Sequence, residues 1–154
     1  MNSERRSNLF RFASGFTFLS RLLLVIVFST SGLSKVISPE TATEFFAKIW
    51  QIDVSITRMG IIGISLAELV LAALLALRPK MLTPPLVACC FFLASLVIGG
   101  SYAGEDIACG CFGGLIESRI NETYFLKNTA LLLISLFLLK TSSRSGLSQT
   151  EANH

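Results

Sequence analysis

The chain has few charged residues, a single histidine and a single tryptophan. Charged residues make up 15% of its 154 residues and hydrophobic residues 52%, a balance far from that of an ordinary soluble domain. No stripe of Lys and Arg interleaved with aromatic residues is present, so nucleic-acid binding is not expected. The only histidine, His154, lies in the polar tail. Because tetrahedral metal sites need four ligands, no metal site is predicted.

Long apolar runs dominate the rest of the chain. About 20 apolar residues in a helix cover the hydrocarbon core of a bilayer, and four runs meet this requirement. The predicted fold is therefore all-α, a polytopic membrane protein with a four-transmembrane-helix bundle in residues 16–140. A basic lead (1–15) precedes it and a disordered tail (141–154) follows. The expected helices are 16–37, 60–77, 82–101 and 124–139.

The first apolar run has two possible interpretations, a retained transmembrane helix and a cleaved secretory signal. Arg21 interrupts the run and Lys35 closes it, whereas a signal has a short apolar region that ends in a small-residue cleavage site. A retained first helix is therefore favoured.

Basic residues gather on one side of the predicted bundle. With four spans both termini share a side, and basic excess marks the cytoplasm. Both termini are therefore expected to be cytoplasmic, and the connection between the last two spans is expected to face the periplasm or cell exterior, where disulfides persist. The basic residues on the side of the termini are Arg5, Arg6, Arg11, Arg78, Lys80, Lys140 and Arg144.

Residues 41–58 alternate charged and aromatic side chains. Glu44, Phe45, Lys48 and Trp50 are typical of this pattern. An amphipathic segment in the membrane interface would place Trp50 at headgroup depth. A surface that docks a partner is the alternative.

A pair of cysteines one glycine apart, Cys109-Gly110-Cys111, lies in the last outward connection. A disulfide closed over so short a ring is strained and easily reduced, and Gly110 best supplies the unusual backbone angles that closure requires. Such a bond favours thiol–disulfide exchange over stapling, because a staple gains most from closing a long loop. A structural disulfide, two inert thiols and a shared metal site are the alternatives.

Cys89, Cys90 and Glu68 are auxiliary candidates within the spans. The two cysteines are expected about 17 Å below the outer surface, as resolving partners or as small apolar residues. Counted from residue 60, Glu68 is expected about 12 Å deep, near the level of Ser29 and Thr30, with Lys35 about 9 Å shallower. A protonated Glu68 bonded to a hydroxyl or backbone group of the first helix competes with a proton-relay or quinone-contact role.

Together these residues resemble the MauE/DoxX family of small membrane proteins. The Cys-Gly-Cys-Phe-Gly element in the final outer connection is the most specific part of the likeness. The matching segments are Arg21 to Leu24, Ser31 to Lys35 with Pro39, Glu68, Cys109 to Gly113, and Lys127 with Asn128. In the MauE branch the resemblance implies a role in maturing a disulfide-rich amine dehydrogenase, and in the DoxX branch a role in quinone-linked sulfur oxidation.

The resemblance implies a protein of the bacterial inner membrane that works with a periplasmic thioredoxin-like partner. Cys109 and Cys111 would be the redox residues of a thiol-disulfide oxidoreductase component, and quinone is the one cofactor candidate. The main alternative is a non-catalytic accessory subunit that binds other membrane subunits. A transporter is a weaker alternative, because only Glu68 hints at a polar pathway.

Overall fold

The computed structural model describes residues 3–78, 81–102 and 122–151, and within α1 and α5 it describes side chains from Gly15 and up to Ser143. All the regular secondary structure in this part of the chain is helical, as predicted. Four of its five helices are long and apolar enough to cross a membrane. The helices are α1 (Ser3–Ile37), α2 (Glu40–Trp50), α3 (Val54–Leu77), α4 (Thr83–Ser101) and α5 (Glu122–Glu151).

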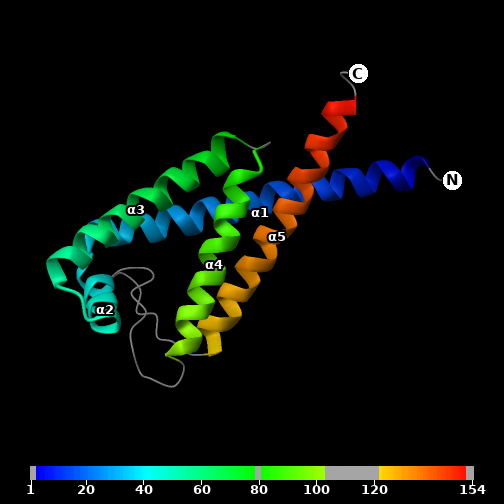
Figure 1. Cartoon of the computed structure of the whole chain (residues 1–154). Coiled ribbons are helices and arrows are strands. Elements are labelled where there is room, and N and C mark those ends of the chain that lie inside the picture. The colour runs from blue at the N-terminus through cyan, green and yellow to red at the C-terminus, as the bar shows by residue number, and fades with distance from the viewer. Residues whose placement is uncertain (1–2, 79–80, 103–121, 152–154) are drawn as a thin grey trace.

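The long helices form two pairs. α1 packs most extensively against α3, and α4 against α5. Figure 1 shows the second pair crossing the first, with α2 at the end of the α1/α3 pair that lies away from both termini. An edge-to-face contact between Phe16 and Phe137 joins α1 to the later part of α5. The beginning of α1 and the end of α5 therefore lie at the same end of the bundle.

Three helix boundaries differ from those expected. α3 begins at Val54 instead of residue 60, because Asp53 accepts a hydrogen bond from the backbone N–H of Ser55 (2.8 Å) and caps the helix. α1 begins at Ser3 instead of residue 16. α2 is an additional helix that closes at Gln51 in the left-handed conformation (φ 52°). α5 continues to Glu151, into the segment 141–154 predicted to be disordered. The division of the chain into lead, membrane domain and tail remains a prediction.

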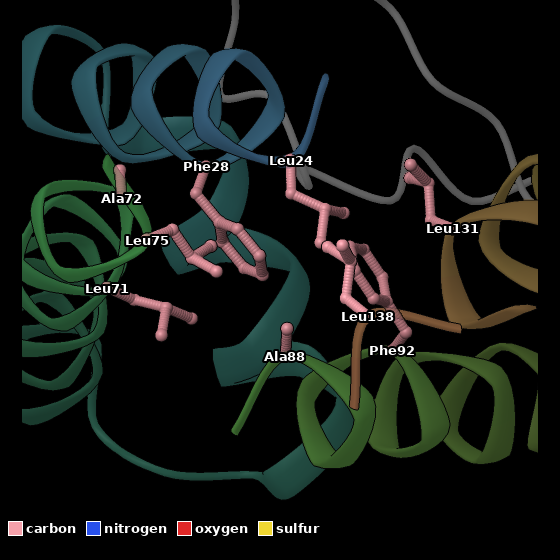
Figure 2. Close-up of a cluster of buried hydrophobic side chains, with 9 residues drawn as sticks. All are labelled: Leu24, Phe28, Leu71, Ala72, Leu75, Ala88, Phe92, Leu131 and Leu138. Carbon is pink, nitrogen blue, oxygen red and sulfur yellow. The ribbon is translucent and has the colours of Figure 1, made fainter. Parts of the chain in front are cut away.

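A hydrophobic cluster joins all four long helices. Phe28 of α1 contacts the rings of Phe91 and Phe92 of α4, with centroids 5.5 and 5.4 Å apart. Figure 2 shows the cluster converging between the helices. Its buried members are Leu24, Phe28, Leu71, Ala72, Leu75, Ala88, Phe92, Leu131 and Leu138.

Small and hydroxyl residues let α1 approach α3 closely. A Cβ atom built on Gly32 would lie 2.9 Å from the backbone oxygen of Ser65, so this crossing requires glycine. The hydroxyls nearby bond within α1: Thr30 donates to Ile26 O (2.8 Å) and Ser34 to Ser31 O (2.9 Å). The close approach occurs at Gly32, while these two hydroxyls bond within their own helix.

Candidate functional site

A buried ion pair links the two helices of the first pair. Lys35 lies in the last turn of α1 and Glu68 near the middle of α3. The Nζ atom of Lys35 lies 2.6 Å from Oε1 of Glu68, and the two side chains are only 5% and 2% exposed. Nζ also donates to Oγ of Ser31 (2.8 Å) and lies 5.9 Å from the ring centre of Phe91. Two charges of opposite sign are thus held in apolar surroundings by direct contact.

Glu68 has a hydrogen bond with a hydroxyl of α1, that of Ser31, as one of the two expectations had it, but its ion pair with Lys35 was not expected. Counting inward from both predicted helix ends placed Glu68 level with Ser29 and Thr30, and Lys35 about 9 Å shallower. That comparison used backbone levels and left out the length and direction of the lysine side chain, which in a helix leans toward the N-terminus. In the structure Nζ of Lys35 lies one turn back along α1, where it donates to Oγ of Ser31 (2.8 Å) and to Oε1 of Glu68 (2.6 Å). Lys35 therefore reaches Glu68 through its side chain.

A cavity of about 360 Å³ lies beside the ion pair. Lys35, Glu68 and Trp50 of α2 are among the residues that line it. Cavities of this size hold small apolar ligands with a few polar contacts. Seven aromatic residues are among those that line it: Phe28, Phe45, Phe46, Trp50, Phe91, Phe92 and Tyr124.

The second helix pair supplies a polar group of its own to the cavity. The hydroxyl of Tyr124 in α5 donates to the backbone oxygen of Ser95 in α4 (2.8 Å), and the amide of Asn128 donates to Tyr124 O (2.9 Å). Gly99 of α4 leaves room for the Tyr124 ring, which would overlap a Cβ atom at that position. These contacts fix Tyr124 where its ring packs against Phe45 of α2.

The predicted redox residues, Cys109 and Cys111, lie outside the residues that the structure describes. Their exchange role remains a prediction. Cys89 is buried, Cys90 is exposed, and neither forms a disulfide. They lie 11 to 12 residues before the end of α4 at Ser101, about 17 Å at the helical rise. In the described part of the chain, no group of three or more His, Cys, Asp or Glu side chains could hold a metal ion.

The Lys35–Glu68 contact is the feature that sequence reasoning missed. Both residues were noted, but as separate features at different depths. A usable signal was present. Lys35 is a single charge at the edge of one apolar run and Glu68 a single charge in the middle of another, and intramembrane charges pair with one another. The aromatic lining of the cavity had no such signal, since its members come from four helices.

Comparison with known proteins gives one match. A family model described as methylamine utilisation protein MauE matches residues 13–141. Neither a curated protein nor a solved structure matches the chain. The family match extends from the apolar part of α1 into α5 and includes the ion pair and the cavity. With four long apolar helices, this makes the chain a multi-pass membrane protein with a membrane-embedded accessory role. The chain belongs to the MauE family.

Proposed function

We propose that this protein is a redox accessory protein in which Cys109 and Cys111 exchange a disulfide with a periplasmic thioredoxin-like partner. The observation that carries the proposal is the position of the pair in the chain. It lies in the connection between α4 and α5, and the end of α4 and the beginning of α5 lie at the end of the bundle away from the termini (Figure 1). Membership of the MauE family supports a role in the membrane.

The exchange needs only sulfur chemistry. A thiolate of the partner attacks the Cys109–Cys111 disulfide and forms a mixed disulfide, releasing one of the two cysteines as a thiolate. The partner's second thiolate then displaces the other cysteine. The partner leaves oxidised and the Cys109–Cys111 pair is reduced by two electrons, and the reverse sequence carries electrons the other way. Cys89, Cys90 and Glu68 are proposed auxiliary residues.

A membrane quinone is the proposed terminal electron partner of the pair. When bound, it would supply reversible two-electron, two-proton chemistry. The aromatic walls of the cavity fit a quinone ring, and Lys35 and Glu68 provide hydrogen-bonding groups at its side. The residues that would hold it are therefore Lys35, Glu68 and the aromatic side chains of the lining.

The proposed location is the bacterial inner membrane with both termini in the cytoplasm. The basic residues of the N-terminal lead, of the connection between α3 and α4 and of the C-terminal region support this orientation. The Cys109–Cys111 segment would then face the oxidising periplasm.

Differential alkylation tests the redox role and the orientation together. In a Cys89→Ser/Cys90→Ser background, whole cells are treated with a membrane-impermeant maleimide before and after reductant. In one physiological state we expect Cys109 and Cys111 to be labelled only after reductant is added. In another we expect them to be labelled without reductant. A labelling pattern that never changes with redox conditions contradicts the exchange role.

The alternative function is a non-catalytic accessory subunit, with the cysteines as a fixed brace. Replacing both Cys109 and Cys111 with serine separates the two functions. We expect the oxidation state of the thioredoxin-like partner to change while the protein still accumulates in the membrane. If the partner's oxidation state is unchanged and a larger membrane complex dissociates instead, the structural alternative is correct.

A further inference from the structure

The cavity beside the ion pair contains an unsatisfied hydrogen-bond acceptor. Oε1 of Glu68 accepts from Lys35 (2.6 Å), whereas Oε2 is buried and has no hydrogen-bond partner among the described residues. Lys35 already donates to both Ser31 and Glu68. A buried carboxylate oxygen without a donor is costly in apolar surroundings. The missing partner at this position is therefore a hydrogen-bond donor.

The walls of the cavity indicate which molecule would carry that donor. Rings from α1, α2, α4 and α5 face the space, and aromatic side chains pack well against another flat ring. Three charged residues line the cavity: Lys35, Glu68 and Lys127. Lys35 and Glu68 neutralise each other, and Lys127 has an interaction of its own. A charged ligand would therefore lose its hydration on entry without a free opposite charge to replace it. The lining therefore favours an uncharged aromatic molecule.

We propose that this cavity binds an apolar aromatic molecule through a ring hydroxyl that donates a hydrogen bond to Oε2 of Glu68. In its ion pair with Lys35 the carboxylate accepts hydrogen bonds, so at Oε2 a hydroxyl fits where an ether does not. Lipophilic phenols and reduced quinones share this chemistry. The proposal uses no cysteine, so it stands or falls separately from disulfide exchange.

Trp50 provides the readout for a binding test. It is the only tryptophan in the chain and lines the cavity, so a bromine atom on a bound ring should quench its fluorescence. The purified full-length protein in detergent is titrated with a ring-brominated octylphenol and with the methyl ether of the same compound. We expect the phenol to bind at least about ten-fold more tightly, because only the phenol can donate to a charged acceptor.

A third probe separates a ring from a flexible lipid. Brominated decanol carries a hydroxyl without an aromatic ring. We expect it to bind more weakly than the phenol. If it binds as tightly, and its affinity also depends on Glu68, the site takes lipid alcohols and the aromatic part of the proposal is wrong.

Two variants connect the preference to Glu68. The double variant Lys35→Met/Glu68→Leu removes both charges together, which leaves no unpaired charge buried, and should bind phenol and ether equally. Glu68→Gln keeps the side-chain volume with a neutral acceptor and should reduce the preference for the phenol. Glu44→Gln, which changes an exposed carboxylate outside the lining, is the matched control and should keep it.

Three outcomes overturn the proposal. The first is equal binding of phenol and ether to the unaltered protein. The second is a preference that survives in both Glu68 variants, with circular dichroism confirming that they are folded. The third is loss of the preference in Glu44→Gln as well, which would place the effect outside the cavity. Binding that is unchanged in Cys109→Ser/Cys111→Ser shows that the site does not depend on the proposed redox pair.

Discussion

The Lys35–Glu68 pair should stabilise the bundle only as a pair. Replacing Glu68 with Ala leaves the ammonium group of Lys35, whose side chain is 5% exposed, without a counter-charge. We expect this variant to lose about 3–5 kcal/mol of unfolding free energy, the usual cost of stranding one partner of a buried pair. Lys35→Ala should cost a similar amount, because it strands the carboxylate.

The size of the effect follows from the contact itself. At 2.6 Å, and with an effective dielectric constant of about 20, the Coulomb attraction is about 6 kcal/mol. Most of this attraction offsets the hydration that both groups lose on burial. Lys35→Met/Glu68→Leu removes both the attraction and the free-energy cost of the lost hydration. It should therefore lie within about 2 kcal/mol of the unaltered protein, well below the sum of the single substitutions.

A double-mutant cycle measures this difference. Unfolding of the four proteins in mixed micelles, followed by circular dichroism, gives the coupling free energy between the two side chains. We expect at least about 4 kcal/mol, with the double variant more stable than either single variant. Single substitutions that add up to within about 0.5 kcal/mol of the double variant would refute the view that the two charges act as one unit.

Three further substitutions test other contacts. Gly32→Ala should destabilise the protein by about 1–3 kcal/mol, because the new Cβ would lie 2.9 Å from Ser65 O. The control Gly63→Ala, with no atom near its Cβ, should be neutral or stabilising by up to about 1 kcal/mol. Equal melting temperatures for the two variants would contradict the close crossing of α1 and α3. Tyr124→Phe loses the hydrogen bond to Ser95 O (2.8 Å) and should cost about 0.5–1.5 kcal/mol in chemical unfolding. Tyr102→Phe, the control, should cost less. The reverse order would show that the bond to Ser95 is unimportant. Asp53→Ala removes the cap on Ser55 N–H (2.8 Å) and should cost about 1 kcal/mol of unfolding free energy. Amide hydrogen exchange should rise in the first turn of α3, whereas the control Asp53→Asn keeps a capping side chain. Unchanged exchange in that turn of Asp53→Ala would argue against the cap.

The sequence was sufficient to predict the four spans because apolar length alone defines them. The helices α1, α3 and α4 match the expected helices closely, except that α1 begins at Ser3 and α3 at Val54. The start of α3 was missed because Arg58 interrupts the apolar run, and the cap at Asp53 was not used as a start signal. The amphipathic pattern of residues 41–58 corresponds partly to a distinct helix, α2.

Contacts between helices could not be predicted from the sequence, for a different reason. Lys35 and Glu68 meet because the lysine side chain runs one turn back along α1, and no pattern along either helix shows which residue of the other helix lies there. The cavity likewise needs side chains from two helix pairs that cross. The Cys109–Cys111 pair is the opposite case: its chemistry follows from its spacing, and it lies outside the described residues, so its role depends on experiment.

Trapping of a mixed disulfide is the most direct test of exchange at Cys109 and Cys111. With only one cysteine of the pair present, the second step of the exchange is blocked and the covalent intermediate should accumulate. Cys109→Ser and Cys111→Ser are expressed separately in a Cys89→Ser/Cys90→Ser background and analysed by non-reducing electrophoresis and mass spectrometry. We predict that one of them forms a reductant-sensitive adduct with a thioredoxin-like protein, and that the variant without either cysteine forms none. The absence of an adduct from both single variants would contradict the proposed function.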